Sequence, residues 1–183
     1  MSDVTAVPLR PVGKSGIVAL WAGIAVLLAA GIGGAYLASE KAVMTAMSPE
    51  EFMAANAKKA GIKTTASGLE YQVIEPGSGP KPTASDVTLV EYRGTLLSGT
   101  QFDATKPNQP VAIPVGQVVP GFAEALMLMP KGAKYRVWIP PQLGYGEQAA
   151  GPIPANSVLV FDLALRDFQA MPAGMPGMQA PGM

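Results

Sequence analysis

Apolar and polar residues alternate along much of the chain between residues 67 and 168. Residues 133–139 read AKYRVWI and residues 159–165 read LVFDLAL, so nearly every second side chain is apolar in both. Residues 69–75 (LEYQVIE) and 86–97 (DVTLVEYRGTLL) have a similar strand-like composition. This period of two predicts half-buried strands, each with one face toward a core.

One segment inside this region has a helical pattern instead. Residues 121–129 read GFAEALMLM and place Phe122, Leu126 and Met129 on one helical face, at spacings of four and three. Pro120 stands at the start, and a Pro-Lys-Gly sequence follows the end. One short helix against antiparallel strands predicts an α+β fold, with a curved antiparallel half-barrel sheet wrapped around the helix.

A long apolar run lies near the N-terminus. Residues 17–38 (IVALWAGIAVLLAAGIGGAYLA) contain no charged residue, with Trp21 and Tyr36 near the ends. A helix of this length spans about 33 Å, which matches a hydrocarbon core of about 30 Å. The basic residues before it predict that residues 1–16 are cytoplasmic and that the rest of the chain lies across the membrane. We therefore predict a single transmembrane anchor.

A cleaved signal peptide is the alternative interpretation of this run. The apolar core of a signal peptide is usually about 7–15 residues long and precedes a small-residue cleavage site. The run here is longer, and the best candidate cleavage site, after Ala35, is a poor match. The retained anchor is therefore the favoured interpretation.

The segments on either side of the strand-rich region are simpler. Ser48-Pro49-Glu50-Glu51 predicts a capped helix start, and the helix is expected to run to Lys59 or Ala60 and to stop at Gly61. It is weakly amphipathic, so a spacer is the favoured interpretation and a dimer contact the alternative. The predicted order is a segment 1–16, an anchor 17–38, a linker with a short helix 39–66, a domain 67–168 and a disordered Met/Pro/Gly-rich tail 169–183.

Composition excludes several kinds of chemistry. The chain has no cysteine and no histidine, which excludes disulfides, thiolate nucleophiles and histidine-dependent hydrolases. No carboxylate cluster with metal-ligand spacing occurs, so no metal and no cofactor is predicted. The 13 basic and 13 acidic residues balance, which argues against nucleic acid as a partner.

Five short motifs, in this order along the chain, resemble those of the FKBP-type peptidyl-prolyl isomerases. They are VEYRG (90–94), GTQFD (99–103), VVPGF (118–122), GYG (144–146) and IPANS (153–157), the last leading into Val160-Phe161. Each motif is weak alone, and the ordered set is specific. The resemblance covers residues 68–168. The stretch 54–74 also resembles the bacterial, envelope-located branch of the family.

The resemblance implies an apolar pocket that binds an X-Pro segment between the helix and the sheet. Phe122 takes the floor position, and Asp103 sits at the edge. The implied walls are Tyr92, Phe102, Val118, Val119, Tyr145, Ile153 and Phe161. The Val119 backbone N–H and the Tyr145 hydroxyl are expected to bind substrate carbonyls. Asp103 could equally cap a turn, and the aromatic residues on strands could be plain core.

Three departures from the family pattern concern this pocket. The floor is usually tryptophan and is Phe122 here, and a substrate-binding wall position that is often aromatic is Val111. The loop before Ile153 lacks the histidine of some relatives. Together these departures imply weaker catalysis, weaker binding of the family's macrolide inhibitors, or an altered preference for the residue before proline.

The implied function is isomerisation of X-Pro bonds in unfolded or nascent polypeptides, without covalent or acid–base chemistry. The implied location is the bacterial inner membrane, with the C-terminal domain in the periplasm, or the soluble periplasm if the signal is cleaved. A catalytically weak binding module or chaperone of the same fold is the alternative. A membrane-tethered scaffold that contacts one fixed partner is a third interpretation.

Overall fold

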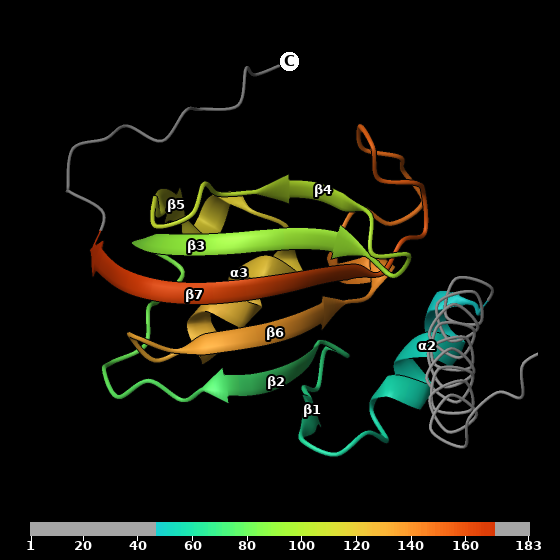
Figure 1. Ribbon diagram of the computed structural model, residues 1–183, viewed down its shortest axis with the longest axis horizontal. Helices are drawn as coiled ribbons and strands as arrows, with labels where there is room; N and C mark the ends of the chain where they lie inside the picture. Colours follow the sequence, from blue (N-terminus) through green and yellow to red (C-terminus); the bar gives the residue numbers. More distant parts are fainter. Residues whose placement is uncertain (1–46, 171–183) are drawn as a thin grey trace, which may run out of the picture. The chain divides into compact units, whose positions relative to one another are not determined.

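A computed structural model of the protein describes residues 47–170 (Figure 1). The predicted anchor at 17–38 and residues 171–183 of the predicted tail lie outside the described residues. Within residues 47–170, neither α-helix is long and apolar enough to cross a membrane.

The described chain forms one antiparallel sheet of seven strands, with two α-helices and two short 3₁₀ turns. The strand order is β1-β2-β6-β7-β3-β4, and β5 pairs with β3 beside this path. The strands are β1 Ile62–Thr64, β2 Glu70–Glu75, β3 Asp86–Leu96, β4 Gln101–Ala104, β5 Val111–Pro114, β6 Lys134–Ile139 and β7 Leu159–Ala170. The helical elements are α2 Pro49–Asn56, η1 Val115–Gln117, α3 Pro120–Leu128 and η2 Pro141–Leu143. The predicted α+β class with an antiparallel sheet is confirmed.

The core lies between the inner face of the sheet and α3. Strand alternation turns Val137 and Ile139 of β6 inward, together with Leu159, Phe161, Leu163 and Leu165 of β7, and all of these are buried. Helix α3 lies behind the sheet in Figure 1 and contributes Phe122 and Leu126 to the same core. The predicted apolar faces of both strands and of the helix therefore meet in one cluster.

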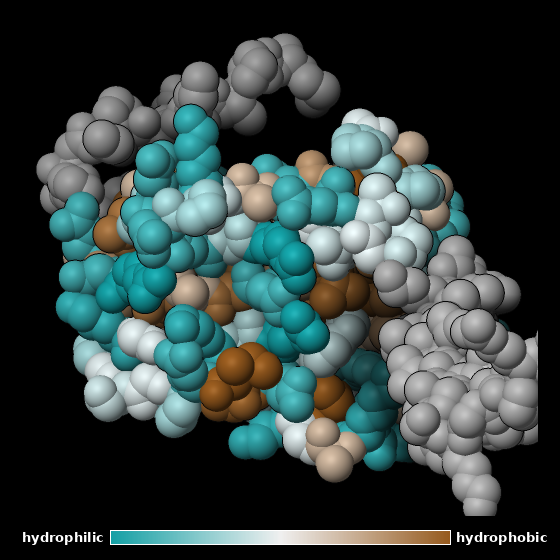
Figure 2. Space-filling model, viewed as in Figure 1, coloured by the Kyte–Doolittle hydropathy of each residue, from teal (hydrophilic) through white to brown (hydrophobic). Residues whose placement is uncertain are grey.

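The outer face of the sheet is mostly hydrophilic, as Figure 2 shows. At its centre, Arg136 Nε donates to Asp162 Oδ1 at 2.6 Å, and Arg93 Nη2 donates to Asp162 Oδ2 at 3.2 Å. Burial acts to raise the pKa of Asp162, but the hydrogen bonds from Arg136 and Arg93 outweigh it and hold this pKa below its usual value. The polar side chains of the predicted alternation thus form ion pairs between neighbouring strands.

Helix α2 packs on the end of this outer face. Its capping box is present: the Glu51 amide donates to Ser48 Oγ at 3.2 Å, and the Ser48 amide donates to Glu51 Oε2 at 3.0 Å. Phe52 is buried with Trp138 of β6, whose alternation predicts an outward-facing side chain. Asn56 Nδ2 donates to the buried Glu70 carboxylate at 2.8 Å. The helix predicted to be a spacer is therefore packed on the sheet.

The helix is also shorter than predicted. It ends at Asn56 instead of Lys59 or Ala60. The Lys59 amide donates to the Asn56 carbonyl and the Ile62 amide donates to the Lys59 carbonyl, so the chain turns there. Gly61, with φ +83°, completes the turn into β1 in a conformation that favours glycine.

Helix α3 approaches the sheet closely at Gly121. A Cβ at this position would lie 2.5 Å from Ile139 Cγ2 and 3.1 Å from Leu143 Cβ. The absence of a side chain therefore sets the distance between α3 and β6.

We expect Gly121→Ala to lower the free energy of unfolding by about 1–3 kcal/mol, because the added methyl group must push α3 away from Ile139. Urea denaturation of the two proteins measures the difference. Gly116→Ala is the matched control, since a Cβ at this position would lie 3.3 Å from its nearest heavy atom. Its loss of unfolding free energy should be clearly smaller. Equal losses in the two variants would contradict the close-packing argument.

Candidate functional site

A cavity of about 530 Å³ opens between α3, the inner face of the sheet and the loop after η2. Its lining is apolar and aromatic, with a few polar groups at the edge. The residues that line it are Tyr92, Phe102, Asp103, Ile113, Gln117, Val118, Val119, Phe122, Tyr145, Ala150, Pro152, Ile153, Leu159 and Phe161. A volume of this size is typical of a small-molecule or peptide side-chain pocket.

Aromatic rings build the deep part of the cavity around Phe161. Its ring meets Phe122 with centroids 5.0 Å apart and planes at 82°, and it meets Phe102 at 5.5 Å and 85°. Tyr92 approaches the Phe122 ring at 5.9 Å and 84°. These edge-to-face contacts fix the rings against one another. The cavity therefore has rigid walls rather than a loose apolar lining.

Gly94 on β3 makes this ring arrangement possible. A Cβ at Gly94 would lie 2.6 Å from Phe102 Cε2 and 2.7 Å from Phe161 Cε1. Strand register explains the closeness, since Gly94 pairs with Asp103 of β4 and with Phe161 of β7. The glycine is thus a structural requirement of the site, and it belongs to the VEYRG motif.

One hydrogen bond orders the polar edge of the cavity. The Tyr92 hydroxyl donates to Asp103 Oδ2 at 2.6 Å. Burial, followed by this hydrogen bond and the charge of Asp103, raises the pKa of Tyr92 to about 12. Tyr92 is therefore a neutral phenol at physiological pH. Of the two alternatives for Asp103, the geometry favours the polar group at the pocket edge over the turn cap.

Two donors at the cavity have no partner among the residues that the structure describes. Tyr145 is 44% exposed at the rim, and Val119 forms the N-cap of α3. Within residues 47–170, no hydrogen bond uses the Tyr145 hydroxyl or the Val119 backbone N–H. Both residues line the cavity. These groups are therefore available to a ligand that presents carbonyl oxygens.

The structure brings together all but one of the predicted site residues. Val111 is the exception: it is the first residue of edge strand β5, is 40% exposed, and does not line the cavity. The lining therefore does not include Val111, and its wall position stays a prediction. Ile113, two residues further on the same strand, lines the cavity instead.

Sequence reasoning missed several lining residues. These are Ile113, Gln117, Ala150, Pro152 and Leu159. The alternation along β7 marks Leu159 as inward-facing, and it contacts both the core and the cavity. Ile113 was detectable as the second residue on the same strand face as Val111. Among the described residues, no three acidic side chains gather in a group that could hold a metal ion.

Comparisons with known proteins agree with this geometry. A family profile described as FKBP-type peptidyl-prolyl cis-trans isomerase matches residues 79–166, and a profile for the domain amino terminal to it matches residues 35–73. A solved peptidyl-prolyl cis-trans isomerase from Pseudomonas syringae pv. tomato is 36% identical, with a TM-score of 0.63 over 70% of this chain and 94% of the other. The chain belongs to the FKBP-type peptidyl-prolyl cis-trans isomerase family.

Curated relatives of this FKBP-type chain come from bacteria. The FKBP-type peptidyl-prolyl cis-trans isomerase FkpA of Aeromonas hydrophila is 50% identical over 129 residues, covering 70% of this chain and 48% of the relative. The outer membrane protein MIP of Legionella longbeachae is 46% identical over 118 residues, covering 63% of this chain and 51% of the relative. The chain spans about half the length of these curated relatives.

We expect Asp103→Asn to lower the pKa of Tyr92 from about 12, because the variant removes the carboxylate that opposes phenolate formation. Burial, the largest cause of the shift, remains, so the pKa should stay above its ordinary value of about 10. A pH titration of phenolate absorbance, with Tyr92→Phe subtracted and folding followed by circular dichroism, measures it. An unchanged pKa would contradict the assigned hydrogen bond.

Proposed function

We propose that this chain catalyses cis-trans isomerisation of X-Pro peptide bonds in unfolded or nascent polypeptides. The observation that carries the proposal is the rigid aromatic cavity, with Phe122 at its base and, at its edge, the Tyr145 and Val119 donors that have no partner within residues 47–170. Family membership supports it, because the profile that covers the cavity is that of the isomerase domain. The proline ring would occupy the aromatic cavity, and the flanking chain would lie across the rim.

An apolar cavity suits this reaction because no bond is made or broken. Amide resonance gives the peptide C–N bond a rotation barrier of about 18–20 kcal/mol. The planar amide is strongly polar, and the twisted transition state, which has lost resonance, is less polar. An environment that excludes water therefore disfavours the planar amide relative to the twisted one. The absence of histidine and cysteine costs this chemistry nothing.

The polar groups at the rim have an orienting role in this proposal. The Tyr145 hydroxyl and the Val119 N–H would donate to substrate carbonyls on either side of the rotating bond. The hydrogen bond between Tyr92 and Asp103 holds the phenol edge in place, so the wall keeps its shape when a substrate enters. Catalysis then depends on fixed geometry and involves no proton transfer.

We expect Tyr145→Phe to lower kcat/KM on X-Pro tetrapeptides about fivefold, as the loss of one neutral hydrogen bond of about 1 kcal/mol predicts. Phe122→Ala should lower it at least about tenfold, because it opens the base of the aromatic cluster. Tyr71→Phe is the matched control, since Tyr71 stacks on Tyr135 away from the cavity, and it should retain full activity.

A protease-coupled assay of the full chain provides these rates. A macrolide inhibitor of the family serves as a second readout, because we propose that it binds the same cavity and should block turnover. No acceleration by a folded chain would refute the enzyme and favour the catalytically weak binding module or chaperone. Full activity of Phe122→Ala would place the catalytic site elsewhere.

We also propose that residues 17–38 anchor the chain in the bacterial inner membrane and place the isomerase domain in the periplasm. The uncharged apolar run supports the anchor. The name of the Legionella relative, an outer membrane protein, supports an envelope location.

If the anchor is retained, the full-length chain should fractionate with inner membranes and should be digested by protease added to spheroplasts. A chain in which arginines replace residues 26–28 should lose the membrane association, because charges at the bilayer centre are unfavourable. A shortened, soluble periplasmic product would instead show that the signal is cleaved.

A further inference from the structure

Residues 144–157 form a loop at the edge of the aromatic cavity, called the rim loop here. It carries Tyr145, Ala150, Pro152 and Ile153 of the cavity lining. Ile153 is its one buried residue, and the remaining side chains are exposed or half-buried. A loop with so little buried surface gains most of its order from the points at which it enters and leaves the fold.

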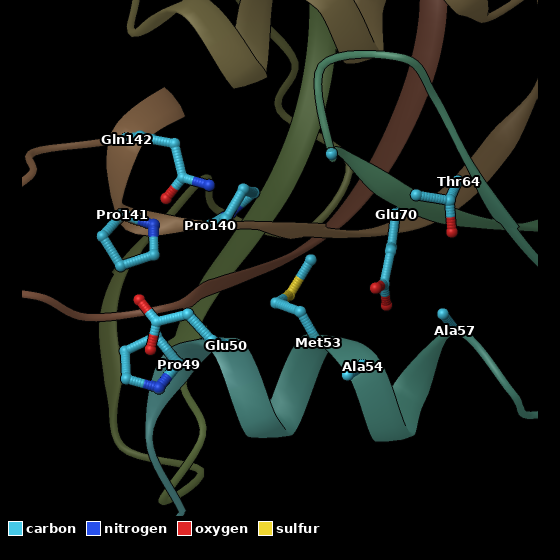
Figure 3. A pocket seen from close by; sticks show the side chains of 11 residues that line it. Pro49, Glu50, Met53, Ala54, Ala57, Thr64, Glu70, Pro140, Pro141 and Gln142 are labelled. Atoms are coloured by element: carbon cyan, nitrogen blue, oxygen red, sulfur yellow. The ribbon is translucent and has the colours of Figure 1, made fainter.

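Helix α2 adjoins the entry point of the rim loop. The chain enters through η2, where Pro140, Pro141 and Gln142 line a cavity of about 290 Å³ together with Pro49, Glu50 and Met53 of α2. Figure 3 shows the Met53 side chain rising from α2 into this space, toward the strands. The Pro141 carbonyl accepts hydrogen bonds from the amides of Gly144 and Gly146, both at 2.9 Å. The segment beside α2 therefore holds the residues on either side of Tyr145.

The same helix adjoins the exit point. Val158 follows the rim loop directly, is 3% exposed, and shares a buried cluster with Phe52 of α2 and Trp138 of β6. The next residue, Leu159, lines the catalytic cavity. Phe52 of α2 thus belongs to the same buried cluster as the residue at the foot of the loop.

A backbone bond links the two ends of the rim loop. The Asn156 amide donates to the Gly146 carbonyl at 2.7 Å. Gly146 is thereby tied to Pro141 on one side and to Asn156 on the other. A shift at either foot would therefore act on the residue next to Tyr145.

Helix α2 itself is firmly attached. The capping box of Ser48 and Glu51 stabilises the helix itself, and the buried Asn56–Glu70 hydrogen bond at its C-terminus attaches it to β2. Phe52 lies between the cap and this attachment. The helix is therefore able to hold the loop, and it does not merely touch it.

We infer that α2 is a positioning element of the substrate site, and that Phe52, through Val158, holds the rim loop in the geometry that places Tyr145 over the cavity. Phe52 does not touch the cavity, so it acts through the loop. The inference rests on the proposed function, because it assigns Tyr145 and Ile153 to substrate binding. It gives the segment before the isomerase domain a role in activity.

The test measures the full chain and its Phe52→Ala variant by amide hydrogen exchange and by isomerase kinetics. We expect exchange in residues 144–157 to speed up, and KM for X-Pro peptides to rise roughly three- to tenfold with a smaller change in kcat. Phe52→Leu, which keeps an apolar side chain in the cluster with Val158, should restore most of the slow exchange in the rim loop and most of the wild-type KM. Unchanged exchange in the rim loop of a folded Phe52→Ala protein would overturn the inference.

Leu165→Ala is the control for general destabilisation. Leu165 is buried in β7 toward the other end of the strand from Val158 and does not line the cavity. It should lower stability without selective exchange in the rim loop and without a rise in KM. An equal rise in KM would show that Phe52→Ala acts only through lost stability and would also overturn the inference.

Two arrangements keep the test decisive. If Phe52→Ala does not fold, Ser48→Ala removes only the helix cap and should give the same pattern in a milder form. If the wild-type chain shows no isomerase activity, the proposed function fails, while the exchange data still decide whether α2 orders the rim loop.

Discussion

The pairing of β3 with β7 is the constraint on which the rest of the structure depends. The two strands stay in register from Leu96 opposite Leu159 to Asp86 opposite Ala170, apart from one irregularity near Leu89. This register puts Gly94 opposite Phe161, so the one residue without a side chain lies where the Phe161 and Phe102 rings approach the strand. A slip of one residue would turn every inward side chain of a strand outward. The aromatic cavity therefore depends first on strand register, and only then on the chemistry of the rings.

A site of this kind has no separable catalytic group. Phe161 and Phe122 stabilise the fold by burial and shape the cavity by the same contacts. Substitutions there change stability and activity together, which is why controls such as Tyr71 and Leu165 are needed to interpret them. The rim is different, because the Tyr145 hydroxyl and the Val119 N–H contribute little to the core and make no hydrogen bond within residues 47–170.

Much of the fold and most of the cavity could be predicted from the sequence. Period-two alternation identified the inward faces of β6 and β7, and the ordered family motifs identified the aromatic walls. Val111 and Trp138 show where such reasoning stops. Val111 is exposed at the start of an edge strand and is not among the residues that line the cavity, and no motif encodes that geometry. Trp138 is buried because α2, distant in sequence, covers the outer face at that point.

The burial of Trp138 also shows how β6 connects the two faces of the sheet. Its neighbours Val137 and Ile139 point into the core, where Ile139 contacts α3 at Gly121, while Trp138 packs outward under Phe52. The strand then continues through Pro140 into η2 and the rim loop. One short strand thus contacts α3 on its inner side and α2 on its outer side, and leads directly to Tyr145. The strand is hydrogen-bonded on both edges, to β2 and to β7, whereas the rim loop that follows, which bears the Tyr145 hydroxyl, is mostly exposed or half-buried.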